Sequence, residues 1–161
     1  MKIRKLITLA LFVAAGCGLF LLEAAIPPIA AVPGLKLGLA NLITLLALRL
    51  YGTREAGICL LCRILLCSLF AGQAVYLFYS AAGGFVCYAV LLLCRRAPLW
   101  AMSALAAIGH NIGQVTVAAA LTRTISVYWL LLYLVICAII SGSMIGIAAA
   151  LLTPRLKRFV K

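Results

Sequence analysis

Acidic residues are nearly absent from this sequence. It has two, Glu23 and Glu55, and no Asp at all, against fourteen Lys and Arg residues. A water-exposed protein surface carries many charges of both signs, so this composition excludes an ordinary soluble domain. Without Asp, the chain also cannot be an enzyme that holds Mg²⁺ through paired aspartates. The Lys and Arg residues form no stripe on a soluble element, so no nucleic-acid partner is predicted.

Several other features are missing as well. No Gly-x-x-x-x-Gly-Lys-Ser/Thr loop occurs, so the chain does not bind a nucleotide through that motif. There is no linker, low-complexity tract or clear internal repeat, and residues 1–161 are predicted to form a single integral membrane domain. Seven cysteines are present, but Cys59-x-x-Cys62 has no neighbouring His or acid to activate it. We therefore expect the cysteines to act as small hydrophobic residues, and we predict no metal and no cofactor.

Long hydrophobic runs dominate what remains. Hydrophobic residues make up 68% of the chain, and its mean hydropathy is +1.28. A helix needs about 20 mostly apolar residues to cross a membrane, with a range of about 17–25. Runs near this length lie at residues 6–26, 35–51, 56–71, 75–94, 99–121 and 127–152, of which the third is short. The sequence therefore predicts an all-α membrane protein built as a bundle of six transmembrane helices.

The basic residues predict the orientation of these helices. Cytoplasmic loops carry an excess of Lys and Arg, because these residues stay on the cytoplasmic side during insertion. Two basic residues, Lys36 and Arg123, lie at the ends of spans that would face outward. The opposite ends carry Lys2, Arg4, Lys5, Arg49, Arg54, Arg95, Arg96, Arg155, Lys157, Arg158 and Lys161. We therefore expect both termini in the cytoplasm, with the basic ends in contact with anionic lipid.

Small residues recur at four-residue spacing in three of the predicted spans. Such faces let helix backbones approach closely inside a membrane. Gly109-x-x-x-Gly113 and Gly142-x-x-x-Gly146 are interpreted as internal packing faces. The face that carries Ala10 and Ala14 lies in the cytoplasmic half of the first span. It is a candidate interface for a partner subunit, with internal packing as the alternative.

Polar residues inside the predicted spans are the candidates for function, because a membrane makes them costly. Glu23, Asn41, Arg63 and His110 lie on four different spans, and Asn111 and Gln114 follow His110 on the fifth. His110 and Gln114 are four residues apart and share a helix face, while Gln73, Tyr76 and Ser80 would form another wall. One interpretation is a ligand site in the outer half of the membrane. The other is that these groups satisfy one another, with Glu23 paired to Arg63.

Three segments resemble a known family. They are Pro33 to Asn41 (PGLKLGLAN), Arg63 to Leu66 (RILL) and His110 to Gln114 (HNIGQ). They are similar to the bacterial membrane family called both heptaprenyl diphosphate synthase component I and Gx transporter. The resemblance implies the architecture of a substrate-binding (S) component of energy-coupling factor (ECF) transporters. It also implies a multi-pass protein of the bacterial cytoplasmic membrane, with Ala10 and Ala14 meeting an ECF transmembrane subunit that works with ATPases.

The function predicted on these grounds is substrate binding within an uptake transporter for a small molecule. The residues expected to meet the substrate are Glu23, Lys36, Asn41, Arg63, His110, Asn111 and Gln114. Lys36 and Arg63 favour an anionic or carbonyl-bearing ligand, because Arg makes planar, bidentate contacts with such groups. The alternative is a non-catalytic membrane accessory subunit of a prenyl diphosphate synthase in isoprenoid or quinone synthesis. In neither case is the chain itself expected to be an enzyme.

Overall fold

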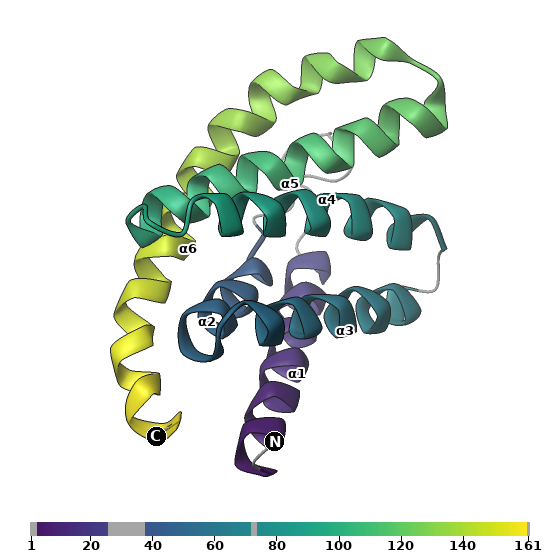
Figure 1. Ribbon diagram of the computed structural model, residues 1–161. Coiled ribbons are helices and arrows are strands. Elements are labelled where there is room, and N and C mark those ends of the chain that lie inside the picture. The colour runs from purple at the N-terminus through teal and green to yellow at the C-terminus, as the bar shows by residue number, and fades with distance from the viewer. Residues whose placement is uncertain (1–2, 26–37, 72–73, 161) are drawn as a thin grey trace.

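The computed structural model describes residues 3–25, 38–71 and 74–160, and this part of the chain is helical without any strand. Figure 1 shows both termini at the lower end of the molecule and the connection between the last two long helices at the upper end. The elements are α1 (Ile3–Ala25), α2 (Asn41–Tyr51), α3 (Thr53–Ala71), α4 (Ala74–Leu93), α5 (Leu99–Thr122), the 3-10 turn η1 (Ile125–Trp129) and α6 (Leu130–Val160).

Helix α2 is shorter than the predicted span 35–51, and that boundary was wrong. The helix begins at Asn41 and has 11 residues. Gly38 has φ +75°, and its carbonyl accepts the Asn41 N–H at 2.8 Å, which forms a turn instead of a continued helix. A positive φ of this kind suits Gly because it has no Cβ. Asn41 therefore stands at the start of α2, where the prediction had placed it well inside a span.

Two other helices extend beyond their predicted ends. Helix α3 begins at Thr53, directly after Gly52, whose φ of +101° lets the chain turn sharply between α2 and α3. Helix α6 follows η1 and continues through Pro154 to Val160, past the predicted end at residue 152. The charged residues of this last stretch are exposed.

Four segments are long and apolar enough to cross a membrane: Ile3–Glu23, Val75–Leu93, Leu99–Thr122 and Ile125–Arg158. Among the described helices, α2 is apolar but too short to count as a span of this kind. Helix α3 is not among the four segments, and it carries the charged residues Arg54, Glu55 and Arg63. The prediction of an all-helical membrane protein is therefore confirmed. The count of six spans is not established by these lengths.

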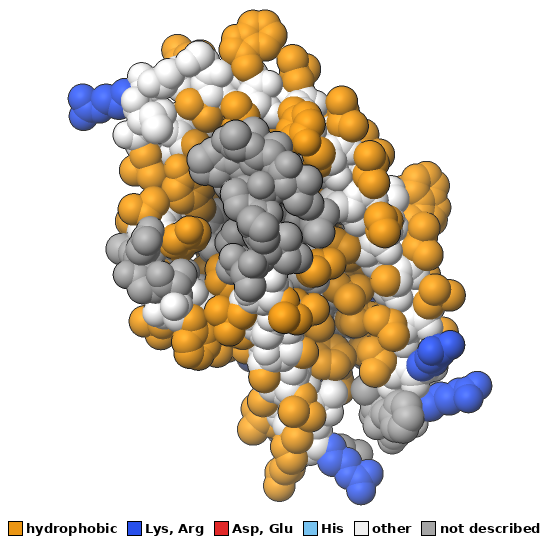
Figure 2. Space-filling view, turned by 180° about the vertical axis from the view of Figure 1, so that it is seen from behind, with side chains coloured by type: hydrophobic (Ala, Val, Ile, Leu, Met, Phe, Trp, Pro, Cys, Tyr) orange, Lys and Arg blue, Asp and Glu red, His pale blue; other side chains and the backbone are white. Residues whose placement is uncertain are grey.

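The surface of the molecule is apolar, as expected for helices in lipid. Figure 2 shows hydrophobic side chains over much of one face. Lys and Arg side chains lie at its lower end, and a further Lys or Arg side chain lies at its upper end. The side chains of Leu69, Ile125 and Trp129 are 76%, 83% and 75% exposed. Soluble monomers rarely expose large continuous apolar patches. Trp100 and Trp129 are exposed near opposite ends of the α5–α6 pair, where a membrane protein places its interfacial aromatic residues.

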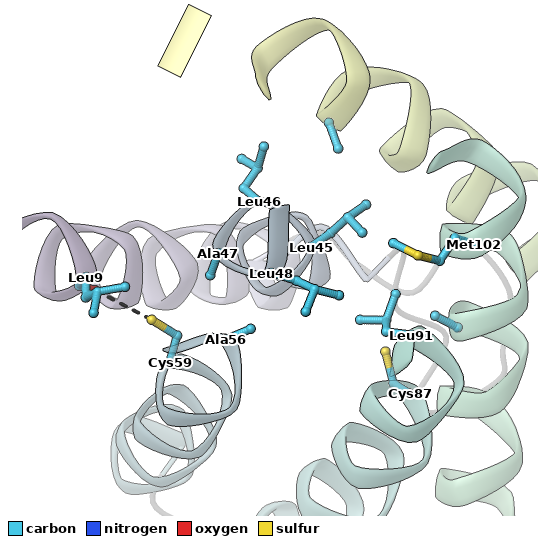
Figure 3. Packing of buried hydrophobic residues seen from close by; sticks show 12 residues of the cluster. Leu9, Leu45, Leu46, Ala47, Leu48, Ala56, Cys59, Cys87, Leu91 and Met102 are labelled. Carbon is cyan, nitrogen blue, oxygen red and sulfur yellow. Dashed lines mark hydrogen bonds between the residues drawn. The ribbon is translucent and has the colours of Figure 1, made fainter. Parts of the chain in front are cut away.

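The short helix α2 lies at the centre of the bundle. Six consecutive residues, from Ile43 to Leu48, are buried, and a helix that is apolar all round is a buried helix. Leu45 packs with Leu91 of α4 and Met102 of α5 in the core cluster (Figure 3). On the other side of α2, Leu9 of α1 lies against Cys59 of α3, whose thiol points to the Leu9 carbonyl. This core packs Leu45 to Leu48 of α2 against the neighbouring helices.

Glycines set the close contacts between α4, α5 and α6. A Cβ on Gly146 would lie 2.5 Å from the Leu99 carbonyl oxygen, and one on Gly113 would lie 2.6 Å from the Ala82 carbonyl oxygen. Gly109 likewise packs on α4 and Gly142 on α5. The predicted packing role of these two glycine motifs is therefore confirmed.

Candidate functional site

A cavity of about 50 Å³ lies among α1, α2, α3, α4 and α5. Five residues predicted to bind substrate line this cavity: Glu23, Asn41, Arg63, His110 and Gln114. Phe20, Gly38, Ala40, Ile64, Cys67 and Ser80 complete the described lining. The structure thus brings together side chains from five helices that are far apart in the sequence.

Arg63 is the Lys or Arg residue among the described lining residues, and it is 7% exposed. Its Nη2 donates a hydrogen bond to Asn41 Oδ1 at 3.1 Å. Gly16 of α1 makes room for the aliphatic part of the side chain, because a Cβ at this position would lie 3.1 Å from Arg63 Cδ. The guanidinium has five N–H groups and no acceptor. Asn41 accepts one of them, and Arg63 lines the cavity.

Glu23 is the anion of the cavity, and it is also 7% exposed. Its Oε1 accepts a hydrogen bond from the Gly38 N–H at 2.5 Å. Glu23 and Arg63 line the same cavity, and the negative charge of Glu23 acts on the guanidinium. Their direct pairing stays a prediction. Both charges are held by hydrogen bonds to neutral groups around the start of α2.

His110 and Gln114 lie against Gly83 of α4. A Cβ on Gly83 would come 2.8 Å from His110 Cε1 and 3.0 Å from Gln114 Cγ. Their shared helix face, predicted from the four-residue spacing, therefore meets α4 at the cavity wall. Gly83 is a residue of the site that the sequence analysis missed. The signal for it was the Gly83-Gly84 pair inside an apolar helix, since Gly in a helix interior is destabilising and often has a packing reason.

The structure does not bring every predicted residue to the cavity. Asn111 belongs to the face of α5 that meets α6, and its Nδ2 donates to the Leu134 carbonyl oxygen at 3.0 Å. Asn111 is not among the described lining residues of the cavity, since adjacent helix positions point about 100° apart, and its contact with substrate stays a prediction. Lys36 lies outside the described residues, as does Gln73. Ser80 lines the cavity as predicted for the second wall, whereas Tyr76 is not part of the described lining.

Asn41 also borders a second, smaller cavity of about 10 Å³. Ser103 and Ala107 line it, together with Gly142 and Ile145 of α6. A volume of this size is near the minimum for one water molecule. On α5, His110 and Gln114 therefore line the first cavity, and Ser103 and Ala107 line the second. Asn41 borders both cavities.

The predicted cytoplasmic ends of α1 and α3 are joined by an ion pair. Lys5 Nζ contacts Glu55 Oε1, and the ammonium also lies 5.9 Å from the centre of the Tyr51 ring. The hydrogen bond from Lys5 lowers the pKa of Glu55 from its ordinary value of 4.5. Both acidic residues of the chain thus have hydrogen-bonded positions in the fold.

The small-residue face of α1 is open. Ala10, Ala14 and Gly18 are exposed, and a Cβ on Gly18 would meet nothing within 4 Å. This contrasts with the glycines of α5 and α6, which contact neighbouring helices of the same chain. Within the described residues, no other helix of the chain covers this face.

The arrangement has the features of a small-ligand site: a partly open cavity, a few convergent polar groups and apolar walls from Phe20 and Ile64. No group of three or more His, Cys, Asp or Glu residues that could hold a metal occurs in the described part of the chain. The fold and the cavity define a polytopic helical membrane protein with polar groups concentrated inside the bundle.

The chain belongs to the heptaprenyl diphosphate synthase component I family, whose model matches residues 12–152. The family suspected from the sequence is therefore confirmed, and the matched region contains all the described cavity residues. No curated protein and no solved structure matches the chain.

Proposed function

We propose that this protein is the membrane-embedded substrate-binding subunit of an uptake transporter for a small molecule, similar to an ECF S component. The observation that carries the proposal is the buried Arg63 in a polar cavity shared by five helices. An intramembrane ionisable group is costly and usually marks a functional site. If these residues served only to pack the helices, no cavity would be needed between them. Arg63, His110 and Gln114 nevertheless line the same cavity.

The proposal includes the membrane arrangement. The protein would lie in the bacterial cytoplasmic membrane with α1 to α6 as six spans, of which α2 is a short, protein-buried one. Non-ideal helices at membrane depth are tolerated where protein surrounds them, and α2 is buried from Ile43 to Leu48. Both termini would face the cytoplasm, in keeping with the basic residues near the ends of α1 and α6.

A partner would supply the energy for transport. The chain has no nucleotide-binding loop of the Gly-x-x-x-x-Gly-Lys-Ser/Thr type, so ATP hydrolysis would take place in partner ATPases. The exposed face of Ala10 and Ala14 would contact a transmembrane subunit. A face of small residues that its own bundle leaves uncovered supports this role, because such faces allow close helix contact in lipid.

The test is affinity purification of the tagged protein in mild detergent, followed by mass spectrometry of the bound proteins and small molecules. We expect ATPase subunits, a large membrane partner and a bound metabolite. Arg63→Ala should lose the metabolite while the protein is still expressed and folded. Asn111→Ala is the matched control, because Asn111 is also a part-buried polar residue but bonds to α6 outside the cavity. Equal metabolite retention in Arg63→Ala and the wild type would refute the assignment of the cavity.

A second function is favoured by the family match itself. The family is named as component I of heptaprenyl diphosphate synthase, which supports a non-catalytic membrane accessory subunit in prenyl diphosphate synthesis. A soluble synthase subunit would dock on the basic ends near Arg54, Arg95 and Arg155, all of which are exposed. In the same purification, a prenyl synthase subunit bound to a protein with an empty cavity would establish this alternative.

A further inference from the structure

Two cysteines from different helices are in contact at the wall of the cavity. Cys17 of α1 and Cys67 of α3 are 50 residues apart in the sequence, and their Sγ atoms lie 3.5 Å apart. Both side chains are buried, and Cys67 is one of the residues that line the cavity. The fold thus forms a pair of thiols from side chains that were expected to act only as small hydrophobic residues.

The contact belongs to a regular seam between α1 and α3. Three contacts of this seam share one register, because the two residues in each of them are 50 positions apart in the sequence. The contacts join Lys5 to Glu55, Leu9 to Cys59 and Cys17 to Cys67. A constant difference in residue number means that the two helices run in the same direction. The thiol pair is therefore part of the packing of two parallel helices.

The two sulfur atoms are within reach of a covalent bond. The S–S distance in a disulfide is about 2.04 Å, so the sulfur atoms have to approach by about 1.5 Å from their present contact. Rotation of a side chain between staggered conformations moves its sulfur atom farther than this. Cys59 and Cys62 have redox-motif spacing, but the Cys59 thiol points to the Leu9 carbonyl and Cys62 is exposed.

We propose that Cys17 and Cys67 are an oxidisable pair, which hydrogen peroxide converts to a disulfide between α1 and α3. One sulfur attacks an oxygen of the peroxide, the O–O bond breaks, and the thiol proton passes to the leaving oxygen, which gives a sulfenic acid and water. The second thiol then attacks the sulfenic sulfur, and its proton leaves with the hydroxyl group as a second water. The two thiols together lose two electrons and two protons, and the peroxide is reduced to water.

The cavity beside Cys67 has room for this oxidant. A water-sized sphere needs roughly 10–15 Å³ of such space, and the cavity measures about 50 Å³. Hydrogen peroxide has two heavy atoms and therefore fits. In the proposed orientation, Cys17 and Cys67 lie in the outward halves of their helices, and disulfides persist in compartments outside the reducing cytoplasm.

The bond locks α1 to α3 beside the polar groups of the cavity. Arg63 stands one helical turn before Cys67 on α3, and Glu23 follows Cys17 on α1. Both charged residues line the cavity. The link therefore fixes the separation of the two helices that carry them.

The test treats the full chain in lipid nanodiscs with hydrogen peroxide, after complete reduction with dithiothreitol and removal of the reductant. The remaining thiols are alkylated, and mass spectrometry with fragmentation of the linked peptides identifies the joined cysteines. We expect the Cys17–Cys67 link to be at least about tenfold more abundant than any other, because thiols held in contact react at a high effective concentration. Dithiothreitol should then restore both thiols.

Variants connect the link to the fold. Oxidation should raise the Tm of the wild type, because a link between two helices restricts the unfolded chain. Cys17→Ala and Cys67→Ala should each lose both the link and the rise in Tm. Cys62→Ala is the matched control, since it removes an exposed thiol of the same helix, and it should keep both.

Two results would overturn the proposal. One is a preferred link between Cys59 and Cys62. The other is full alkylation of Cys17 and Cys67 after peroxide has already oxidised the exposed Cys62. The peptide map of the wild type decides between these outcomes and the expected one, even if an alanine variant does not fold.

Discussion

The contact between Gly83 and His110 gives a graded test of the site. In Gly83→Ala the new Cβ would lie 2.8 Å from His110 Cε1, 2.9 Å from His110 Nδ1 and 3.0 Å from Gln114 Cγ. These distances are too short for a Cβ, so the His110 ring or the backbone around Gly83 has to shift. Overpacking costs about 1–3 kcal/mol, and replacing Gly by Ala in a helix returns about 0.5–1 kcal/mol. We expect a net loss of between about 0 and 2.5 kcal/mol in stability. The relative loss of ligand binding should be larger.

Two other glycines calibrate this prediction. Gly18→Ala places a Cβ in open space, so the isolated protein should keep or gain up to about 1 kcal/mol of stability. In Gly146→Ala the Cβ would meet the Leu99 carbonyl oxygen and Trp100 Cα at 2.5 Å. Backbone atoms of a packed helix yield less than a ring at a cavity edge, so this variant should be the least stable of the three.

The assay is thermal unfolding in one detergent, with ligand retention measured on the same preparations. The expected order of Tm is Gly18→Ala, then Gly83→Ala, then Gly146→Ala, with ligand binding reduced in Gly83→Ala beyond what its Tm explains. If Gly83→Ala matches Gly18→Ala in both Tm and ligand retention, then His110 does not depend on Gly83 for its position, and the packing of His110 at the cavity wall is refuted.

Three further predictions follow from contacts outside the cavity. Asn111→Ala removes the hydrogen bond to the Leu134 carbonyl. It should lower the stability measured in unfolding assays by about 1 kcal/mol and leave ligand binding unchanged. A loss of ligand binding at unchanged stability would contradict this prediction. Because Lys5 lowers the pKa of Glu55 from 4.5, the pair should stabilise the fold above that pH and lose its effect as acid titrates the folded carboxylate below it. The drop in Tm below about pH 4.5 should therefore be larger for the wild type than for Glu55→Gln. Equal drops would show that the Lys5–Glu55 pair does not contribute to the acid sensitivity of the fold. Ala14→Leu enlarges an exposed position, so it should reduce co-purification of membrane partners at unchanged Tm, whereas undiminished recovery would remove this face as an interface.

Much of this protein could be predicted from the sequence, because the physics involved is local. The near absence of acidic residues and the long apolar runs determine an all-helical membrane protein through composition alone. Four-residue spacing places His110 and Gln114 on one face of α5, and it gives the glycine pairs of α5 and α6 their packing role. The same spacing argument could have separated Asn111 from that face, since it adjoins His110 and points elsewhere.

Other features depended on contacts between distant parts of the chain, which a periodicity does not encode. Only the fold put Arg63 against Gly16 and Asn41, and only the fold left the Ala10 and Ala14 face uncovered while it filled the glycine faces of α5 and α6. The short α2 was missed because an apolar run does not show where Gly38 turns the backbone. The sequence alone therefore determined which polar groups lie within apolar helical runs. Tertiary packing decided which of them meet, because helices in lipid associate through close contacts between particular side chains instead of through a general hydrophobic drive.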